Sequence, residues 1–335
     1  MIGLIDIDSK LPNLVLMKIS NYYKSLGEQV EFVKEKGVYS KIYASAIFTK
    51  SEHKCRELIK KHGEILEMGG TGWDLGKRLP PEIESMQPDY SLYTADMIYQ
   101  RIRGGIGKKE TKVAKAQTIV DAGQGFSSRG CVRQCKFCMV PRKEGAFCQV
   151  AEIKDLINPK SKVLILNDNN LSADPLAIEK LAEIHDRGLV VDINQGCDIR
   201  LMTDELAKAL SVVKHLRSIH YAWDLMGFEQ QVFRGIKTLS KHIKAYRQMC
   251  FILVGFDTDF SEDVYRFQKL REFGVDPFVM VYNQKADERL KHFARWVNSR
   301  IYKVSSFESY VPWMNAQIWM ADALEVERTQ FKWAF

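Results

Sequence analysis

Apolar positions over residues 1–70 follow two alternating periods, one typical of strands and one typical of helices. Short apolar or β-branched runs predict four strands, at residues 1–8, 29–33, 41–48 and 64–68. Two stretches with helical spacing lie among them, at residues 12–26 and 51–62. Pro12 suits the first turn of the first helix, and Ser51 suits the cap of the second. The alternation predicts a small Rossmann-like α/β domain with a parallel sheet.

A second and more regular alternation follows. Its predicted strands are residues 123–128, 162–167, 189–195, 217–223, 250–255 and 277–282. Its predicted helices are residues 150–157, 174–186, 203–213, 228–247 and 261–273. Six parallel strands joined by right-handed helical crossovers predict a partial (β/α)6 TIM-like barrel. Such barrels place their sites at the carboxyl ends of the strands.

The segments outside these two series set the domain organisation. Residues 71–115 are rich in Gly, Pro and Tyr and then in basic residues, which predicts an irregular connector and a boundary near Gln117. The last segment is helical in pattern and rich in aromatic residues, which favours an extension that covers the core, with a substrate lid as the alternative. The predicted domains are therefore 1–116, 117–285 and a helical C-terminal extension, 286–335.

Composition narrows the class of protein. The chain of 335 residues is 46% hydrophobic and 27% charged, which is typical of a globular protein. No apolar run approaches the roughly 20 residues that a membrane span needs, so we expect no membrane partner. The first residues lack the basic start of a signal peptide, and the seven cysteines are an odd number. We therefore expect reduced thiols and a cytoplasmic location.

Charge adds one candidate surface. The net charge is +7, and residues 101–115, RIRGGIGKKETKVAK, hold six basic residues and one acid, or +5. This run is either a solvated linker or a contact for nucleic acid or an anionic substrate. RNA and a polypeptide are both candidate substrates.

Three of the cysteines are closely spaced, at Cys131, Cys135 and Cys138. A structural zinc site usually has four protein ligands in two pairs, and a redox dithiol needs only two cysteines. Three thiolates in one short loop can hold three irons of a 4Fe–4S cluster and leave the fourth iron open. The pattern therefore predicts an iron–sulfur cluster whose open iron binds a small chelating ligand.

The run Arg129-Gly130-Cys131-x-x-x-Cys135-x-Phe137-Cys138 resembles the signature of the radical S-adenosylmethionine superfamily. The resemblance covers residues 117–285. It implies a partial barrel, a 4Fe–4S cluster on the three cysteines, and S-adenosylmethionine chelated by its amino and carboxylate groups. It also implies reductive cleavage to a 5′-deoxyadenosyl radical that abstracts hydrogen from a substrate, and a flavodoxin- or ferredoxin-like reductant.

The same resemblance adds candidate cosubstrate contacts at the strand ends. Asn167 and Asp168 stand where many members have a Gly-Gly-Glu segment, and they offer acceptors to an ammonium. Asn194 and Gln195 can hydrogen-bond a ribose. Arg200 either pairs with the methionine carboxylate or forms an ion pair with Asp198 or Asp204. The remaining candidates are Phe137, Tyr221, Gly255 and Tyr282.

Alternatives remain open for the front domain and for the other cysteines. The front domain resembles the cobalamin-binding domain of one subgroup, with Gly69 and Gly70 after a strand, but it lacks the Asp-x-His-x-x-Gly segment. A vestigial nucleotide fold is therefore the favoured interpretation of the front domain. Cobalamin-dependent methylation is the alternative. Cys197 and Cys148 are either small buried residues or contributors to catalysis or an auxiliary cluster.

For the whole protein, the alternative from another functional class is a non-catalytic iron–sulfur or zinc protein.

Overall fold

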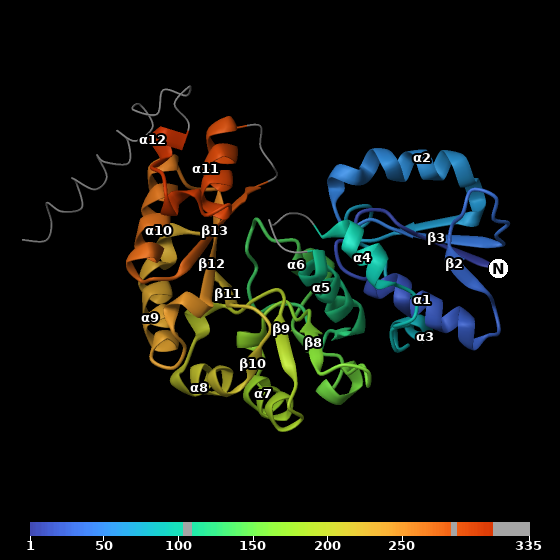
Figure 1. Ribbon diagram of the computed structural model, residues 1–335, viewed down its shortest axis with the longest axis horizontal. Coiled ribbons are helices and arrows are strands. Elements are labelled where there is room, and N and C mark those ends of the chain that lie inside the picture. Colours follow the sequence, from blue (N-terminus) through green and yellow to red (C-terminus); the bar gives the residue numbers. More distant parts are fainter. Residues whose placement is uncertain (103–108, 283–286, 311–335) are drawn as a thin grey trace, which may run out of the picture. The chain divides into compact units, whose positions relative to one another are not determined.

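The computed structural model describes residues 1–102, 109–282 and 287–310. They form two compact units. Unit 1 comprises residues 1–130 and 139–167, and unit 2 comprises residues 131–138 and the chain from Asp168 onward. Each unit contains parallel strands joined by helices, so the chain has a mixed α/β fold with parallel sheets (Figure 1).

The first sheet of unit 1 confirms the four strands predicted at the start of the chain. Its members are β1 (Ile2–Asp6), β2 (Val30–Phe32), β3 (Lys41–Ser45) and β4 (Leu66–Gly69). The order is β2-β1-β3-β4, and every pairing is parallel. Parallel neighbours need crossover connections, and helices supply them here.

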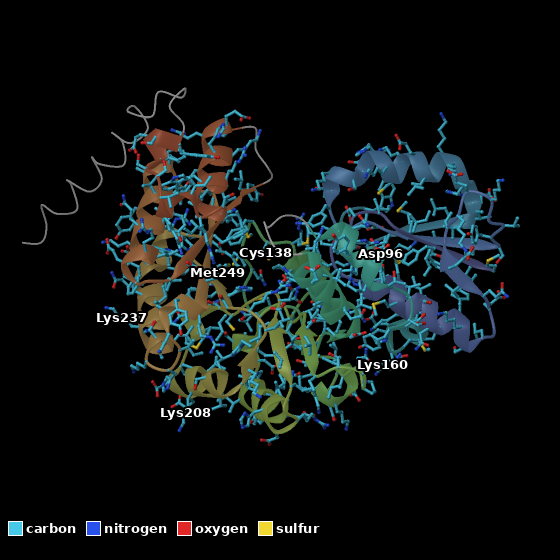
Figure 2. All side chains as sticks on the ribbon, viewed as in Figure 1. Asp96, Cys138, Lys160, Lys208, Lys237 and Met249 are labelled. Carbon is cyan, nitrogen blue, oxygen red and sulfur yellow. The ribbon has the colours of Figure 1, made fainter. Side chains whose placement is uncertain are left out.

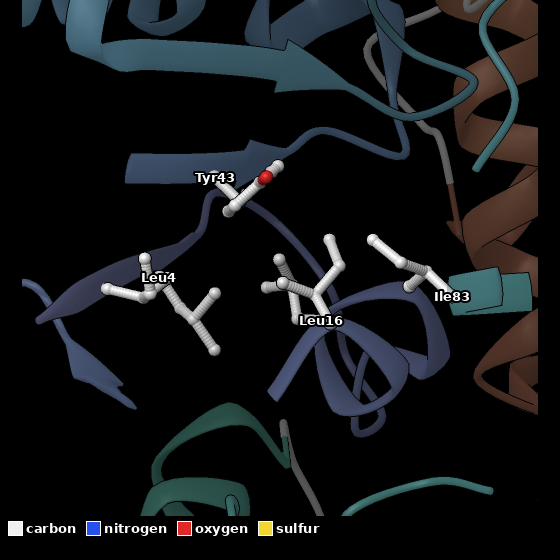
Figure 3. Packing of buried hydrophobic residues seen from close by; sticks show 6 residues of the cluster. Leu4, Leu16, Tyr43 and Ile83 are labelled. Carbon is white, nitrogen blue, oxygen red and sulfur yellow. The ribbon is translucent and has the colours of Figure 1, made fainter. Parts of the chain in front are cut away.

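Helices α1 (Leu14–Ser25) and α2 (Glu52–His62) cover opposite faces of this sheet (Figure 1). Successive side chains of a strand point to opposite faces. On β3, Tyr43 packs with Leu4 and Leu16 of one core cluster (Figure 3), whereas Ala44 packs with Cys55 of α2 in another. Cys55 is thus a buried apolar residue of the sheet–helix interface.

The two predicted helix starts in this unit differ in outcome: the first is wrong, whereas Ser51 stands at the cap position of α2 as predicted, although without the capping hydrogen bond. Helix α1 begins at Leu14, and Asn13 is its cap, because the Asn13 side chain accepts a hydrogen bond from the Leu16 N–H. Pro12 therefore lies outside the first turn. The Ser51 side chain makes no capping hydrogen bond to α2, because a 3-10 turn over Thr49–Ser51 leads directly into the helix.

The predicted irregular connector contains helices, so that expectation is wrong for much of its length. The helices are α3 (Pro81–Glu84), α4 (Ala95–Arg101) and α5 (Lys109–Asp121). Ile98, Ile119 and Val120 bury against Met17 and Tyr93, and this tertiary packing outweighs the polar local sequence. Helix α5 spans the predicted boundary at Gln117. Residues 103–108 of the basic run lie outside the described residues.

The rest of unit 1 supplies two of the predicted strands. β5 (Gly123–Gly125) pairs in parallel with β8 (Val163–Leu166), and β6 (Ser128–Arg129) pairs antiparallel with β7 (Cys148–Gln149). A short helix α6 (Val140–Lys143) lies between them in sequence. The predicted helix at 150–157 is only a 3-10 turn, Ile153–Leu156, because Glu152 and Asp155 cap each other across a single turn.

Unit 2 confirms the remaining predicted strands. They are β9 (Val190–Ile193), β11 (Ile219–Ala222), β12 (Gln248–Val254) and β13 (Asp276–Val281), with the short β10 (Lys214–His215) beside β9. β11, β12 and β13 pair in parallel, and a parallel bridge joins Cys197, just after β9, to Tyr221 in β11. The carboxyl ends of these strands therefore face the same way.

Helices alternate with the strands of unit 2. They are α7 (Ala177–Asp186), α8 (Asp204–Val212), α9 (Glu229–Ser240), α10 (Phe260–Glu272), α11 (Glu288–Asn298) and α12 (Phe307–Tyr310). The predicted helix at 228–247 ends at Ser240, and a separate 3-10 turn, Ala245–Arg247, precedes β12.

The described part of the predicted C-terminal extension is helical. Trp296 and Phe293 of α11 bury against Phe267 of α10 and against Phe307. Aromatic rings in edge-to-face contact stabilise such an interface. Trp313, Trp319 and Trp333 lie outside the described residues. Among the helices that the structure describes, none has the length and apolar character needed to cross a membrane.

Candidate functional site

The three closely spaced cysteines lie on a turn at the start of unit 2 (Figure 2, Cys138 labelled). The Cys138 N–H donates to the Cys135 carbonyl at 2.9 Å, which closes the turn. All three thiols are free and partly exposed. Within unit 1, Gly130 precedes this turn with a φ of 78°, and a Cβ there would lie 2.2 Å from the Ala146 carbonyl oxygen. Only glycine fits that position.

The Cys131 sulfur accepts two N–H donors. The Arg133 backbone N–H and the Asn170 side-chain amide each lie 3.4 Å from it. Asn170 is buried, and its amide oxygen has no hydrogen-bond partner within the described residues. N–H donors at a ligating sulfur tune the potential of the cluster that it holds.

Charged groups surround the Cys135 thiol. Burial raises the pKa of Cys135, while the positive charge of Arg200 opposes that rise and Asp224 adds to it. Arg200 donates two hydrogen bonds to Asp198, at 2.6 and 2.9 Å. Arg133, from the cysteine loop itself, donates at 3.0 Å to Oδ2 of the same carboxylate, an oxygen that also accepts from Arg200. Burial raises the pKa of Asp198, but these two cations outweigh it and hold that pKa below its ordinary value.

Asp224 is held by a buried cation that sequence reasoning missed. The Arg266 side chain is fully buried and donates to the backbone oxygens of Trp223 and Asp224, at 2.7 and 3.0 Å. It also donates to the Leu253 carbonyl at 2.7 Å. Arg266 thus ties together the carboxyl ends of β11 and β12. Burial raises the pKa of Asp224 to about 6, and the charges of Arg266 and Arg200 limit that rise.

A row of aromatic rings extends from the cysteine loop. The Phe137 ring lies 5.4 Å from that of Phe256, which in turn lies 4.8 Å from that of Tyr282, both edge to face. Phe256 was also missed, although it directly follows Gly255. Gly255 has a φ of 77°, and a Cβ there would lie 2.7 Å from a methyl group of Leu290. The backbone therefore turns sharply where β12 ends.

The other predicted contacts differ in their surroundings. Asn194 is half-buried and Gln195 exposed after β9, and Asp168 is buried. Asn167 is buried in unit 1. The Tyr221 side chain is fully buried, and its hydroxyl donates to the Gln248 side chain at 2.8 Å. For these residues a role in cosubstrate binding stays a prediction.

The remaining cysteines have distinct environments. Cys197 is buried, and burial raises the pKa of its thiol to about 11. Its backbone N–H donates to the His220 carbonyl at 2.8 Å. Cys250 is also buried, whereas Cys148 is exposed on the edge strand β7. The surroundings of Cys197 are those of a small apolar core residue.

The donor chemistry of the cysteine loop fits an iron–sulfur cluster, although the three sulfur atoms are not grouped as metal ligands. Within residues 1–102, 109–282 and 287–310, no group of three or more His, Cys, Asp or Glu side chains is arranged to hold a metal ion. Three accessible thiols on one turn, with two N–H donors at Cys131 and a cation at Cys135, are the groups that such a cluster uses. Binding would require the three side chains to turn toward one another.

Comparison with known proteins gives weak likenesses only. No protein-family model matches the sequence, and no curated protein matches it. Among solved structures, Streptococcus suis SuiB bound to the precursor peptide SuiA is 12% identical, with a TM-score of 0.38 over 60% of this chain and 54% of that chain. SuiB bound to S-adenosylmethionine is 12% identical, with a TM-score of 0.36 over 60% and 52%. The chain thus spans about half the length of these structures, and such likenesses do not assign a function.

Proposed function

We propose that this protein is a radical S-adenosylmethionine enzyme. The observation that carries the proposal is the convergence of strand ends on the cysteine loop. Arg200 after β9 and Asp224 after β11 act electrostatically on Cys135, and Phe256 after β12 packs on Phe137. Parallel α/β folds build their active sites from segments at the carboxyl ends of strands. The loop with three thiols therefore lies where such folds do their chemistry.

Cys131, Cys135 and Cys138 would hold three irons of a 4Fe–4S cluster and leave one iron open. When bound, the cluster would supply the electron that cleaves S-adenosylmethionine into methionine and a 5′-deoxyadenosyl radical. The chain's own residues would bind, orient and shield the cosubstrate. Asn170 would hold the Cys131 sulfur through its amide N–H.

The residues around the loop have the chemistry to orient the cosubstrate. Arg200 would offer its guanidinium to the methionine carboxylate, provided that it shares or leaves Asp198. Asn194 and Gln195 would contact the ribose. Phe137 and Tyr282 belong to the aromatic row that would exclude water beside the adenine. The proposed scaffold is the six-stranded partial barrel, with a helical extension after it.

Fold and cluster do not name a substrate. A flavodoxin- or ferredoxin-like protein would supply electrons. A non-catalytic iron–sulfur or zinc protein is the competing class. Only the enzyme would form 5′-deoxyadenosine, so this product distinguishes the two classes.

The test is anaerobic reconstitution with iron and sulfide, followed by S-adenosylmethionine and dithionite, with 5′-deoxyadenosine measured by mass spectrometry. We expect 5′-deoxyadenosine from the wild-type protein and from Cys148→Ala, a matched control for an exposed cysteine outside the loop. We expect none from Cys138→Ala. A fully loaded cluster that yields no 5′-deoxyadenosine, or zinc as the only tightly bound metal, would overturn the proposal.

A further inference from the structure

A pocket lies in unit 2 at the amino ends of β11 and β12, opposite the strand ends that meet the cysteine loop. Its volume is about 240 Å³. It is lined by Leu210, Ser211, Val213, His215, Arg217, Ile219, His242, Ile243, Lys244, Tyr246 and Arg247. No residue of the cysteine loop lines this pocket. The role of the pocket is therefore independent of the proposed enzymatic function.

Most of the polar side chains of this lining are basic. They include Arg217, Lys244 and Arg247 together with two histidines, and no Asp or Glu lines the pocket. Arg217 is partly neutralised by Asp192 at 3.3 Å. Lys244 and Arg247 have no ion pair among the residues that the structure describes. The pocket therefore carries positive charge without a partner, which attracts an anion.

Lys244 and Arg247 are placed to act together. The Arg247 N–H donates to the Lys244 carbonyl at 2.9 Å, across the 3-10 turn that precedes β12. Lys244 stands just before this turn and Arg247 is its last residue, and both line the pocket. An ammonium and a guanidinium that line one pocket form a basic clamp suited to phosphate, which accepts forked hydrogen bonds from Arg.

The other wall of the pocket is apolar. Leu210, Val213, Ile219 and Ile243 are buried beneath it. Tyr246 stands at the rim with 67% of its surface exposed, which is unusual for a large aromatic side chain in a folded domain. An exposed ring beside free cations suits stacking with a planar heterocycle.

We propose that this basic pocket binds a nucleoside monophosphate, with the phosphate on Lys244 and Arg247 and the base against Tyr246. The basic clamp recognises the phosphate, and the apolar wall with its rim tyrosine recognises the base. Neither part alone accounts for the whole lining, because a bare anion leaves the apolar wall unused and a nucleoside leaves the cations unpaired.

The test is calorimetric titration of the full-length protein with adenosine 5′-monophosphate, inorganic phosphate and adenosine. We expect saturable binding of the monophosphate, tighter than that of either part. The double variant Lys244→Ala/Arg247→Ala should weaken it about tenfold or more, because it removes charge-assisted hydrogen bonds. Tyr246→Ala should reduce the preference for the monophosphate over inorganic phosphate.

The matched control is Lys208→Ala/Lys237→Ala, which removes the same charge from exposed positions on α8 and α9 outside the pocket (Figure 2). We expect it to change the affinity by less than about twofold, since distant surface charges are screened by salt. Equal losses in the pocket and control variants, or no saturable binding of the monophosphate, would overturn the proposal. Binding of an RNA oligonucleotide without binding of the monophosphate would also overturn it.

Discussion

The side-chain amide of Asn170 lies 3.4 Å from the sulfur of Cys131 and donates to it. The two residues are far apart in the sequence, and Asn170 is buried while the thiol is partly exposed. The amide of a buried residue therefore contacts the sulfur of the first cysteine of the loop.

This contact predicts that substitution of Asn170 changes the reduction potential of the proposed cluster. Replacing Asn170 by Ala should leave cluster loading intact and lower the reduction potential by about 20–60 mV, the equivalent of one hydrogen bond in a one-electron couple. The donor favours the more negative reduced state, so its loss makes reduction harder. A redox titration followed by electron paramagnetic resonance measures the shift. Gln134→Ala, an exposed change in the same loop, is the control. An unchanged potential in Asn170→Ala would show that the amide does not act on the cluster.

Substitution of Arg200 can separate its two proposed roles, which are binding of the methionine carboxylate and pairing with Asp198. If Arg200 contacts the methionine carboxylate, Arg200→Lys should weaken S-adenosylmethionine binding about tenfold, because Lys cannot form the two-pronged pair. Arg133→Lys is the matched control, since Arg133 donates to the same Asp198 carboxylate. Affinity is measured by equilibrium binding to the reconstituted protein. Equal effects of the two substitutions would assign Arg200 to the structural pair with Asp198.

The buried contacts of Arg266 predict that this residue stabilises unit 2. Arg266→Met should reduce the free energy of unfolding by about 3–5 kcal/mol, because it leaves the buried Asp263 carboxylate without its cation. Chemical denaturation measures the change. Lys269→Met, on the same helix in a more exposed pair with Glu272, should cost about 1 kcal/mol or less. The double variant Arg266→Met/Asp263→Leu should recover part of the loss. A loss in Arg266→Met no greater than that in Lys269→Met would contradict the buried network.

The thiols should differ in reactivity. Alkylation of the native protein at about pH 8 should label Cys148 rapidly and leave Cys197 unlabelled, because burial raises the pKa of Cys197 to about 11 and excludes the reagent. Peptide mass spectrometry before and after denaturation reports both sites. Rapid native labelling of Cys197 would show that it faces an open cavity, and its catalytic role would return as a candidate.

The strands of unit 2 could be predicted because their apolar runs are short, β-branched and bounded by turns, as in the segment that forms β12. The cysteine loop could be found because its thiols are neighbours in sequence. The contacts of Asn170 and Arg133 could not, because they join segments that meet only after folding. Arg266 was missed for a related reason. A charged residue on a helix predicts a solvated face, and only the tertiary structure shows carbonyl groups around it.

Local signals also failed where tertiary packing decides. Pro12 is a good first-turn residue, but Asn13 has a side chain that both caps α1 and donates to Ser45 of the sheet. Helix α5 lacks a clear apolar stripe, and its burial is confined to its last turns, at Ala116, Ile119 and Val120. The local composition, rich in Gly, Pro and basic residues, therefore indicated an irregular segment there.

We propose that an open iron at the cysteine loop binds S-adenosylmethionine. The most direct measurement is electron–nuclear double resonance on the reduced, reconstituted protein with S-adenosylmethionine labelled at its carboxylate. We expect a cluster signal that changes when S-adenosylmethionine is added and shows hyperfine coupling to the label. A cluster signal that is unchanged at saturating S-adenosylmethionine, with a fourth ligand from the protein, would contradict it.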